Sequence, residues 1–117
     1  MTARRRALGR AGEELAVEWY VARGWEVLDR NWRVREGELD VIAWRQGILA
    51  VCEVKTRTTD AFGTGAEAVT WRKQKRIRML AGRYLATWPP GRPRPRELRF
   101  DVADITAHRI DVIEGAF

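Results

Sequence analysis

Two carboxylic acids and a lysine form the pattern in this sequence that has the clearest chemical meaning. Asp40 is followed after twelve intervening residues by Glu53, and Lys55 lies two positions further on. Carboxylate oxygens bind hard divalent cations such as Mg²⁺ and Mn²⁺. A bound ion of this kind activates phosphate esters toward hydrolysis, and a neighbouring lysine can stabilise the negative charge of the transition state. These residue types therefore indicate a site for a hard divalent cation, if the fold brings the two acids together.

A two-residue hairpin loop at Gln46-Gly47 would bring these side chains together. Such a loop places Asp40 directly opposite Glu53, and it places Glu38 opposite Lys55. Facing side chains in an antiparallel pair lie about 4.5–5.5 Å apart at Cβ. Four ionisable groups would then converge on one face of the hairpin.

The strand expected over 48–54 is apolar except for Glu53, so a carboxylate there is costly to bury. Two facing carboxylates repel each other unless a cation or a shared proton lies between them, and oxygen ligands suit Mg²⁺ or Mn²⁺. Two alternatives stay open. A three-residue loop would place Asp40 opposite Cys52, and Lys55 could form a plain ion pair with a neighbouring glutamate.

The charge distribution of the 117 residues agrees with a phosphate-binding protein. The chain has 22 Lys and Arg against 16 Asp and Glu, a net charge of +6. Segments 1–10 and 71–99 are strongly basic, whereas 11–70 is acidic on balance. Basic segments suit nucleic-acid phosphates and the central acids suit a metal ion, although solvated helix faces are the alternative. We expect one domain over 1–117, with 1–7 as a flexible basic arm.

Composition excludes several other classes of protein. The longest apolar run, Ile48–Cys52, is too short for a membrane span, and no secretory signal is recognisable, so we expect a cytoplasmic protein without a membrane partner. Cys52 and His108 are the only Cys and His, which rules out a disulfide within the chain and a structural zinc site. The absence of Ser excludes serine acyl-transfer triads.

Hydrophobic periodicity predicts an α/β fold with a mixed sheet flanked by helices. The first helix ends before Gly24 and carries an apolar stripe of Leu8, Ala11, Leu15, Trp19 and Ala22. The second helix covers 70–88, with an apolar stripe from Ile77 to Trp88 and a basic opposite face. The strands are expected over 25–34, 39–44, 48–55, 98–105 and 109–113.

A longer set of motifs surrounds the acids and the lysine. The motifs are Gly12-Glu13, Arg30-Asn31-Trp32-Arg33, Gly37-Glu38-Leu39-Asp40, Glu53-Val54-Lys55-Thr56-Arg57, Phe62-Gly63, Lys73 and Arg99-Phe100-Asp101. The Asp…Glu-x-Lys part resembles the signature of restriction-endonuclease-like nucleases, with Leu39 where that signature often has Pro. The whole set resembles the YraN-like family of bacterial proteins, which is similar to archaeal Holliday-junction resolvases.

The resemblance implies an αβββαβ core and a catalytic metal site. Asp40, Glu53 and the backbone carbonyl of Val54 would be ligands, and Lys55 would orient the attacking water. Glu13 matches an acid that completes the site in resolvase-like relatives. A helical wheel, however, places Glu13 about 160° from Leu15, so a solvated acid is the alternative.

The resemblance also implies contacts to nucleic acid. Lys73 resembles a helix cation that contacts phosphate in this superfamily, and Arg57, Arg72 and Arg76 are further candidates. The partner would be DNA, branched or otherwise structured by likeness to resolvases, and resolvase-like enzymes act as homodimers. A glycine-rich motif at 63–68 resembles a dinucleotide fingerprint but lacks its context, so no nucleotide cofactor is expected.

Three functions therefore compete on the sequence alone. The first is a Mg²⁺-dependent or Mn²⁺-dependent endonuclease acting on DNA. The second is a nucleic-acid-binding module that keeps the nuclease fold without catalysis. The third is an interaction protein in which the acidic cluster is only an ion-pair network.

Overall fold

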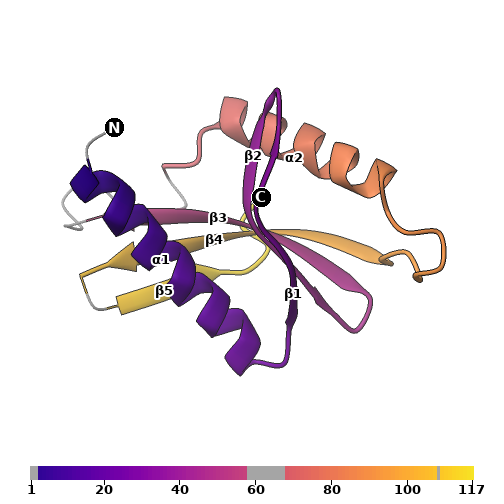
Figure 1. The fold of residues 1–117 in the computed structure, drawn as a ribbon, viewed down its shortest axis with the longest axis horizontal. Helices are drawn as coiled ribbons and strands as arrows, with labels where there is room; N and C mark the ends of the chain where they lie inside the picture. Colours follow the sequence, from indigo (N-terminus) through magenta and orange to yellow (C-terminus); the bar gives the residue numbers. More distant parts are fainter. Residues whose placement is uncertain (1–2, 58–67, 108) are drawn as a thin grey trace.

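The computed structural model describes residues 3–57, 68–107 and 109–117, with the side chains of 3–8 left out. Its elements are α1 (Ala3–Ala22), β1 (Glu26–Val34), β2 (Gly37–Arg45), β3 (Ile48–Arg57), α2 (Trp71–Ala86), β4 (Glu97–Thr106) and β5 (Arg109–Ile113) (Figure 1). Their order confirms the expected αβββαβ core, with one further strand at the C-terminal end. Most of the glycine-rich motif at 63–68, and His108, lie outside the described residues.

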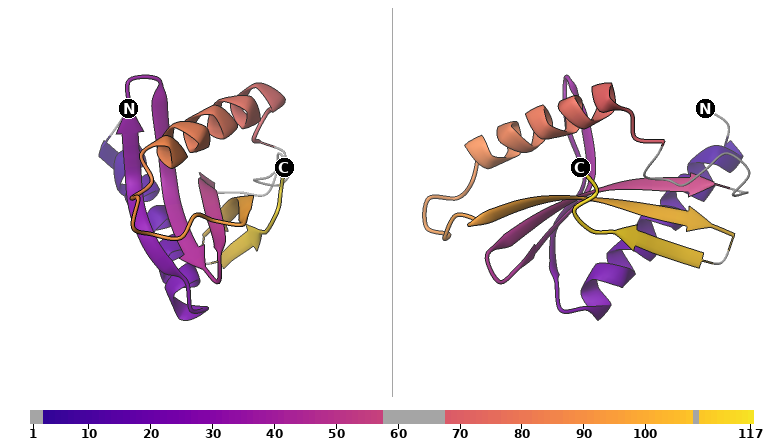
Figure 2. Two further views of the ribbon diagram at one scale, coloured as in Figure 1. Left: turned by 90° about the vertical axis from the view of Figure 1, so that its right-hand side faces the viewer. Right: turned by 180° about the vertical axis from the view of Figure 1, so that it is seen from behind.

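The five strands form one mixed sheet in the order β1-β2-β3-β4-β5. The β3–β4 pair is parallel, and the other three pairs are antiparallel. The helices lie on opposite faces of this sheet (Figures 1 and 2), and each face has its own apolar core. The predicted α/β class with a flanked mixed sheet is confirmed. Within the described residues, no helix is both long and apolar enough to cross a lipid bilayer.

The core on the α2 face follows the predicted apolar stripe. Ile77, Leu80 and Ala81 are its buried residues, spaced so that they share one side of the helix. Thr70 caps the N-terminus, where its side chain accepts a hydrogen bond from the backbone N–H of Lys73. The helix ends at Ala86, shortly before the two prolines that cannot continue it.

The face of α1 that packs on the sheet is shifted by one residue along the chain from the predicted apolar stripe. Ala16 and Tyr20 are fully buried, and Gly12 lies one turn earlier on the same side. Leu15 is 38% exposed, so the predicted stripe through Leu15 is wrong. The physical reason is close packing, because a Cβ added to Gly12 would overlap the hydroxyl oxygen of Thr56 on β3.

The N-terminal end of the chain also differs from the expectation. The backbone of residues 3–7, expected to form a flexible basic arm, belongs to α1, which begins at Ala3. At the other end of the helix, Gly24 has a φ of 86°, as expected for the glycine that follows a helix.

The hairpin between β2 and β3 has the predicted two-residue loop. Gln46 and Gly47 have φ values of 50° and 82°, and positive φ at both positions is required by a type I′ turn. Arg45 pairs with Ile48 across this turn. The alternative three-residue loop is therefore excluded, and the register is the one that directs Asp40 toward Glu53.

Candidate active site

The site forms where β2 and β3 separate. Their ladder runs from Arg45↔Ile48 to Val41↔Cys52, after which β2 continues along β1 and β3 continues along β4. Figure 1 shows β2 turning away from β3 toward α2. Just past the last pair, Asp40 Oδ2 accepts a hydrogen bond of 2.8 Å from the backbone N–H of Val54. A side chain therefore bridges the two strands where their backbones no longer pair.

The backbone of β1 is irregular opposite Asp40. The β1–β2 ladder includes Arg30↔Val41 and Trp32↔Leu39, and between these pairs Asn31 has a φ of 51°. Leu39 packs in the α2-face core, whereas Val41 packs in the α1-face core. Two residues that are two positions apart in a regular strand share a face, so the alternation of side chains along β2 is broken at Asp40. Sequence reasoning missed the role of Asn31, although Asn is a residue type that tolerates positive φ.

Glu53 occupies the α2 face of β3, which it shares with Leu49 and Val51 by strand alternation. Its carboxylate is buried and pairs with two lysines. Lys73 Nζ on α2 lies 2.8 Å from Glu53 Oε1, and Lys55 Nζ lies 3.7 Å from the same oxygen. The ion pair of Lys55 that was the alternative to a catalytic role is therefore present. The ion pair of Lys73 was not anticipated.

Burial and like charge act together on Asp40. Its side chain is 8% exposed, and burial raises its pKa to about 7, with the charge of Glu53 as the next largest cause. The hydrogen bond from Val54 partly opposes this rise. Within the described residues, no lysine or arginine forms an ion pair with Asp40. Its carboxyl group is therefore buried without a cation at ion-pair distance, although the charges of Lys55 and Lys73 interact with it.

The two lysines influence each other because they share Glu53. Burial lowers the pKa of Lys55, and the neighbouring Lys73 adds to this effect. For Lys73, burial acts to lower the pKa, but the ion pair with Glu53 outweighs it and the net shift is upward. Lys73 is thus held as the cation of the pair, and Lys55 is the lysine that loses its proton more readily.

Glu13 approaches the site from the other face of the sheet. It is half-buried on α1, and its charge is one of the causes that raise the pKa of Asp40. The helical wheel directed Glu13 away from the sheet because it took Leu15 as a buried residue, and that assumption is wrong because Leu15 is exposed. Relative to Gly12 and Tyr20, Glu13 lies at the edge of the face that contacts the sheet.

Glu38 does not form the expected facing pair with Lys55. Its carboxylate accepts a hydrogen bond of 2.8 Å from Arg33 on β1, because β2 has already left β3 at this level. Glu38 nevertheless lines a cavity of about 220 Å³ together with Glu53, Lys73 and Arg76. This cavity lies between the N-terminal end of β2 and the first half of α2. It holds two acids and two cations and opens to solvent.

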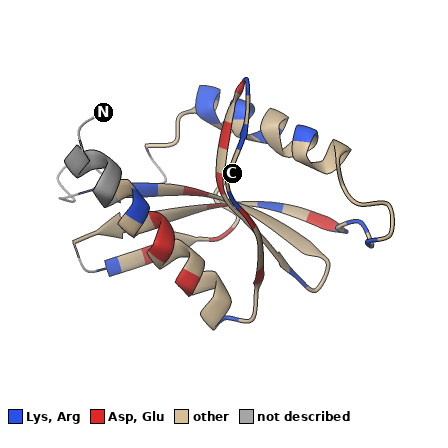
Figure 3. Cartoon of the chain, viewed as in Figure 1, with Lys and Arg blue, Asp and Glu red and all other residues tan. Residues whose placement is uncertain are grey.

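The remaining candidate cations have different surroundings. Arg57 forms a bidentate ion pair with Asp104 on β4, with distances of 3.0 and 2.8 Å, so its guanidinium is held against the sheet. Arg72 is exposed near the start of α2, beside the exposed Trp71. Figure 3 shows Lys and Arg along α2, mainly in its first half. Basic residues of α2 therefore adjoin this cavity of mixed charge, in agreement with the basic face predicted for the helix.

The donor set can be compared with what a divalent cation needs. Among the described residues, no three His, Cys, Asp or Glu side chains lie close enough together to hold a metal ion. Asp40 and Glu53 form a pair of neighbouring carboxylates, and Mg²⁺ commonly uses one or two carboxylates and takes its other ligands from water and substrate phosphates. Asp40 forms no ion pair within the described residues and would be open to such a cation, and Glu53 would exchange Lys73 for it.

Many known protein sequences are related to the sequence of this chain. The model of a family described as "Uncharacterised protein family UPF0102" matches residues 12–114. A UPF0102 protein of Frankia alni is 47% identical over 116 residues, covering 95% of this chain and 94% of its own length. UPF0102 proteins of Kineococcus radiotolerans and Myxococcus xanthus are 49% and 42% identical, covering 86% and 98% of this chain and 80% and 92% of their own lengths.

Proposed function

The chain belongs to the uncharacterised protein family UPF0102, and we propose that it is a divalent-metal-dependent endonuclease that hydrolyses phosphodiester bonds of DNA. The observation that carries the proposal is the buried carboxylate of Asp40, which lies beside Glu53 and forms no ion pair within the described residues. Two buried carboxylates side by side are retained at a cost to stability. A cation that binds during function gives a reason for that cost.

Each residue of the cluster has a role in this proposal. Asp40, Glu53 and the backbone carbonyl of Val54 would hold Mg²⁺ or Mn²⁺, which when bound supplies Lewis-acid activation of the phosphodiester and of water. Glu13, on the opposite face, adds negative charge near Asp40 and favours a cation there. Lys55, with its lowered pKa, would position the attacking water and take up its proton.

The cations of α2 would bind the substrate backbone. If Glu53 held a metal, Lys73 would lose its partner and would be free to contact a phosphate oxygen at the cavity that both residues line. Arg76 lines this cavity, and Arg72 extends the basic surface along the helix. Contacts of this kind position nucleic acid without reading its sequence. Branched or otherwise structured DNA is the substrate that the resemblance to resolvases implies.

A second candidate function has its own supporting observation. Lys73 and Lys55 both pair with Glu53, so one of the two acids is already neutralised by the protein itself. A chain that uses this ion-pair network permanently would bind DNA through α2 without cleaving it. The two functions differ in whether a divalent ion produces cleavage.

One experiment separates the two functions. The full chain is incubated with Mn²⁺ or Mg²⁺ and with branched, single-stranded and duplex DNA, and both cleavage and binding are measured. The nuclease proposal expects cleavage that requires the metal and is abolished in Asp40→Asn and Glu53→Gln, while binding is largely kept. Glu18→Gln, an exposed acid on α1, is the matched control and should cleave normally. Binding without cleavage by any of these ions would favour the second candidate.

A further inference from the structure

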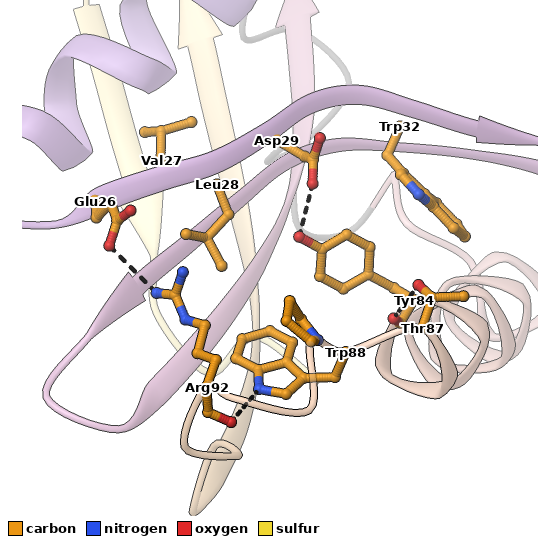
Figure 4. Close-up of a pocket in the computed structure, with 10 residues that line it drawn as sticks. Glu26, Val27, Leu28, Asp29, Trp32, Tyr84, Thr87, Trp88 and Arg92 are labelled. Carbon is orange, nitrogen blue, oxygen red and sulfur yellow. Dashed lines mark hydrogen bonds and ion pairs between the residues drawn. The ribbon is translucent and has the colours of Figure 1, made fainter.

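A second cavity lies at the opposite end of α2 from Lys73. It has a volume of about 440 Å³ and opens between β1 and the C-terminal end of the helix. Figure 4 shows its walls, in which the aromatic and aliphatic side chains of Leu28, Trp32, Tyr84 and Trp88 lie beside polar groups. The charged groups at its rim are Glu26, Asp29 and Arg92. None of these residues takes part in the proposed nuclease site.

One half of the cavity already holds a cation of the protein. The guanidinium carbon of Arg92 lies 5.0 Å from the ring centre of Trp44 and 5.3 Å from that of Trp88. The same guanidinium forms an ion pair of 3.2 Å with Glu26 (Figure 4). Aromatic faces attract cations through their quadrupole, and the carboxylate adds direct charge attraction. A guanidinium is thus held at the edge of the cavity, against Trp88 of its lining and against Trp44.

The other half has the same chemistry but no cation. Asp29 Oδ2 accepts a hydrogen bond of 2.7 Å from the hydroxyl of Tyr84, and the rings of Tyr84 and Trp32 meet edge to face with centres 5.4 Å apart. Within the described residues, no lysine or arginine pairs with Asp29. A half-buried carboxylate without a cation is unexpected on a chain with a net charge of +6. Burial and Asp29 together raise the pKa of Tyr84, so its hydroxyl keeps its proton at neutral pH.

We propose that Asp29, Trp32 and Tyr84 form a binding site for a guanidinium or alkylammonium group. The ligand would place its positive charge beside Asp29 and its carbon chain against the aromatic walls, as Arg92 does in the neighbouring half. The site shares with that half a carboxylate beside aromatic rings, but the rings of Trp32 and Tyr84 meet at 87°, whereas those of Trp44 and Trp88 meet at 36°. A phosphate group is disfavoured there because two carboxylates lie at the rim.

The position of the site indicates how a peptide would reach it. β1 is an edge strand of the described sheet, so one side of its backbone is open to pairing with an added strand. The ladder to β2 is interrupted between Val27 and Asp29, at the mouth of the cavity. An extended segment that carries Arg or Lys could pair with β1 and insert that side chain. A free polyamine is the other source of the same chemical group.

Ligand titration of the full chain by NMR or tryptophan fluorescence tests the site. The probes are acetyl-arginine amide, spermidine, an extended pentapeptide with a central Arg, and the same pentapeptide with norleucine at that position. We expect saturable binding of the cationic probes and none of the norleucine peptide. Asp29→Asn, which keeps an acceptor for Tyr84, should weaken binding about three- to fivefold. Glu97→Gln, an exposed acid at the start of β4, should bind as the unaltered chain does.

The outcomes identify both the site and its ligand. Tighter binding of the Arg pentapeptide than of acetyl-arginine amide, with amide shifts along β1, supports a protein segment as the ligand. Equal or tighter binding of spermidine supports a free amine. The proposal is overturned if no cationic probe binds, or if Asp29→Asn and Trp32→Leu bind as well as the unaltered chain while thermal unfolding shows both variants to be folded.

Discussion

Asp40 on β2 is joined to Val54 on β3 by one hydrogen bond of 2.8 Å, formed one residue beyond the last backbone pair of the two strands. The contact holds a carboxylate in the opening between the strands and beside Glu53. Because both acids are buried, the opening combines negative charge with low exposure to water. The stability of the protein should therefore depend on the protonation of Asp40, in a direction that can be measured.

Asp40→Asn should stabilise the metal-free protein at high pH. The pKa of Asp40 is about 7 in the folded chain and about 4 in an unfolded one, so the folded state binds the additional proton between these values. Stability then falls as the pH rises from 4 to 7, and the ionised carboxylate costs on the order of 1–3 kcal/mol above pH 7. Urea unfolding in EDTA should show the variant more stable than the unaltered chain at pH 8.

The same measurement at low pH is the internal control for this prediction. Near pH 4 the carboxyl of Asp40 is protonated in the folded protein, so the advantage of Asn should nearly disappear. An advantage that is equal at pH 4.5 and pH 8 would contradict the assignment of the pH dependence to Asp40. Glu18→Gln should change the stability of the protein little at either pH, since the side chain of this acid is exposed on α1.

Divalent metal should stabilise the unaltered chain and not Asp40→Asn. A ligand that binds only the folded state adds about 1.4 kcal/mol at ten times its dissociation constant. The melting temperature should therefore rise with Mn²⁺ or Mg²⁺, and more at pH 8 than at pH 6, because protons compete for Asp40 at the lower pH. Addition of EDTA should reverse the rise. An equal rise in the variant would place the ion elsewhere.

Removal of Lys73 should affect metal and DNA in opposite directions. Lys73→Ala releases Glu53 from its 2.8 Å ion pair, so metal affinity should rise or stay constant. DNA affinity should fall, and the slope of its logarithm against log salt should decrease by about one unit if Lys73 contacts a phosphate. Arg94→Gln, an exposed cation in the loop before β4, is the matched control for loss of charge. An unchanged salt slope in Lys73→Ala would remove this residue from the DNA-binding surface.

The sequence predicted the order of helices and strands along the chain, and the hairpin, because local signals determine them. Gln46-Gly47 allows positive φ at both turn positions, and the period of two along β3 fixes which face Glu53 occupies. The meeting of Asp40 with β3 followed from that register. The pairing of Glu53 with Lys73 could not be predicted, because it depends on how α2 crosses the sheet, and the residues between β3 and α2 carry no signal for that geometry.

The phase of α1 was predicted wrongly for a related reason. Hydrophobic periodicity counts large apolar side chains, and Leu15 and Trp19 weigh more in it than Gly12 and Ala16. The structure instead buries the small residues, because they let α1 approach β3 closely. The spacing of Gly12, Ala16 and Tyr20 was the available signal. With this phase, Glu13 lies at the edge of the packed face, where its charge acts on Asp40.

Gly12→Ala should therefore destabilise the protein, although alanine favours helices. The new methyl group would overlap Thr56 Oγ1, a buried oxygen for which the described residues provide no hydrogen-bond partner, and such overpacking typically costs about 1–3 kcal/mol. Gly9→Ala, in the same helix with nothing within 4 Å of the added Cβ, should instead stabilise by about 0.5–1 kcal/mol. Urea unfolding of both variants measures the contrast. Adding Thr56→Ala to Gly12→Ala removes the overlapping oxygen and should restore most of the lost stability, and a strictly additive double variant would contradict the close packing of α1 on β3.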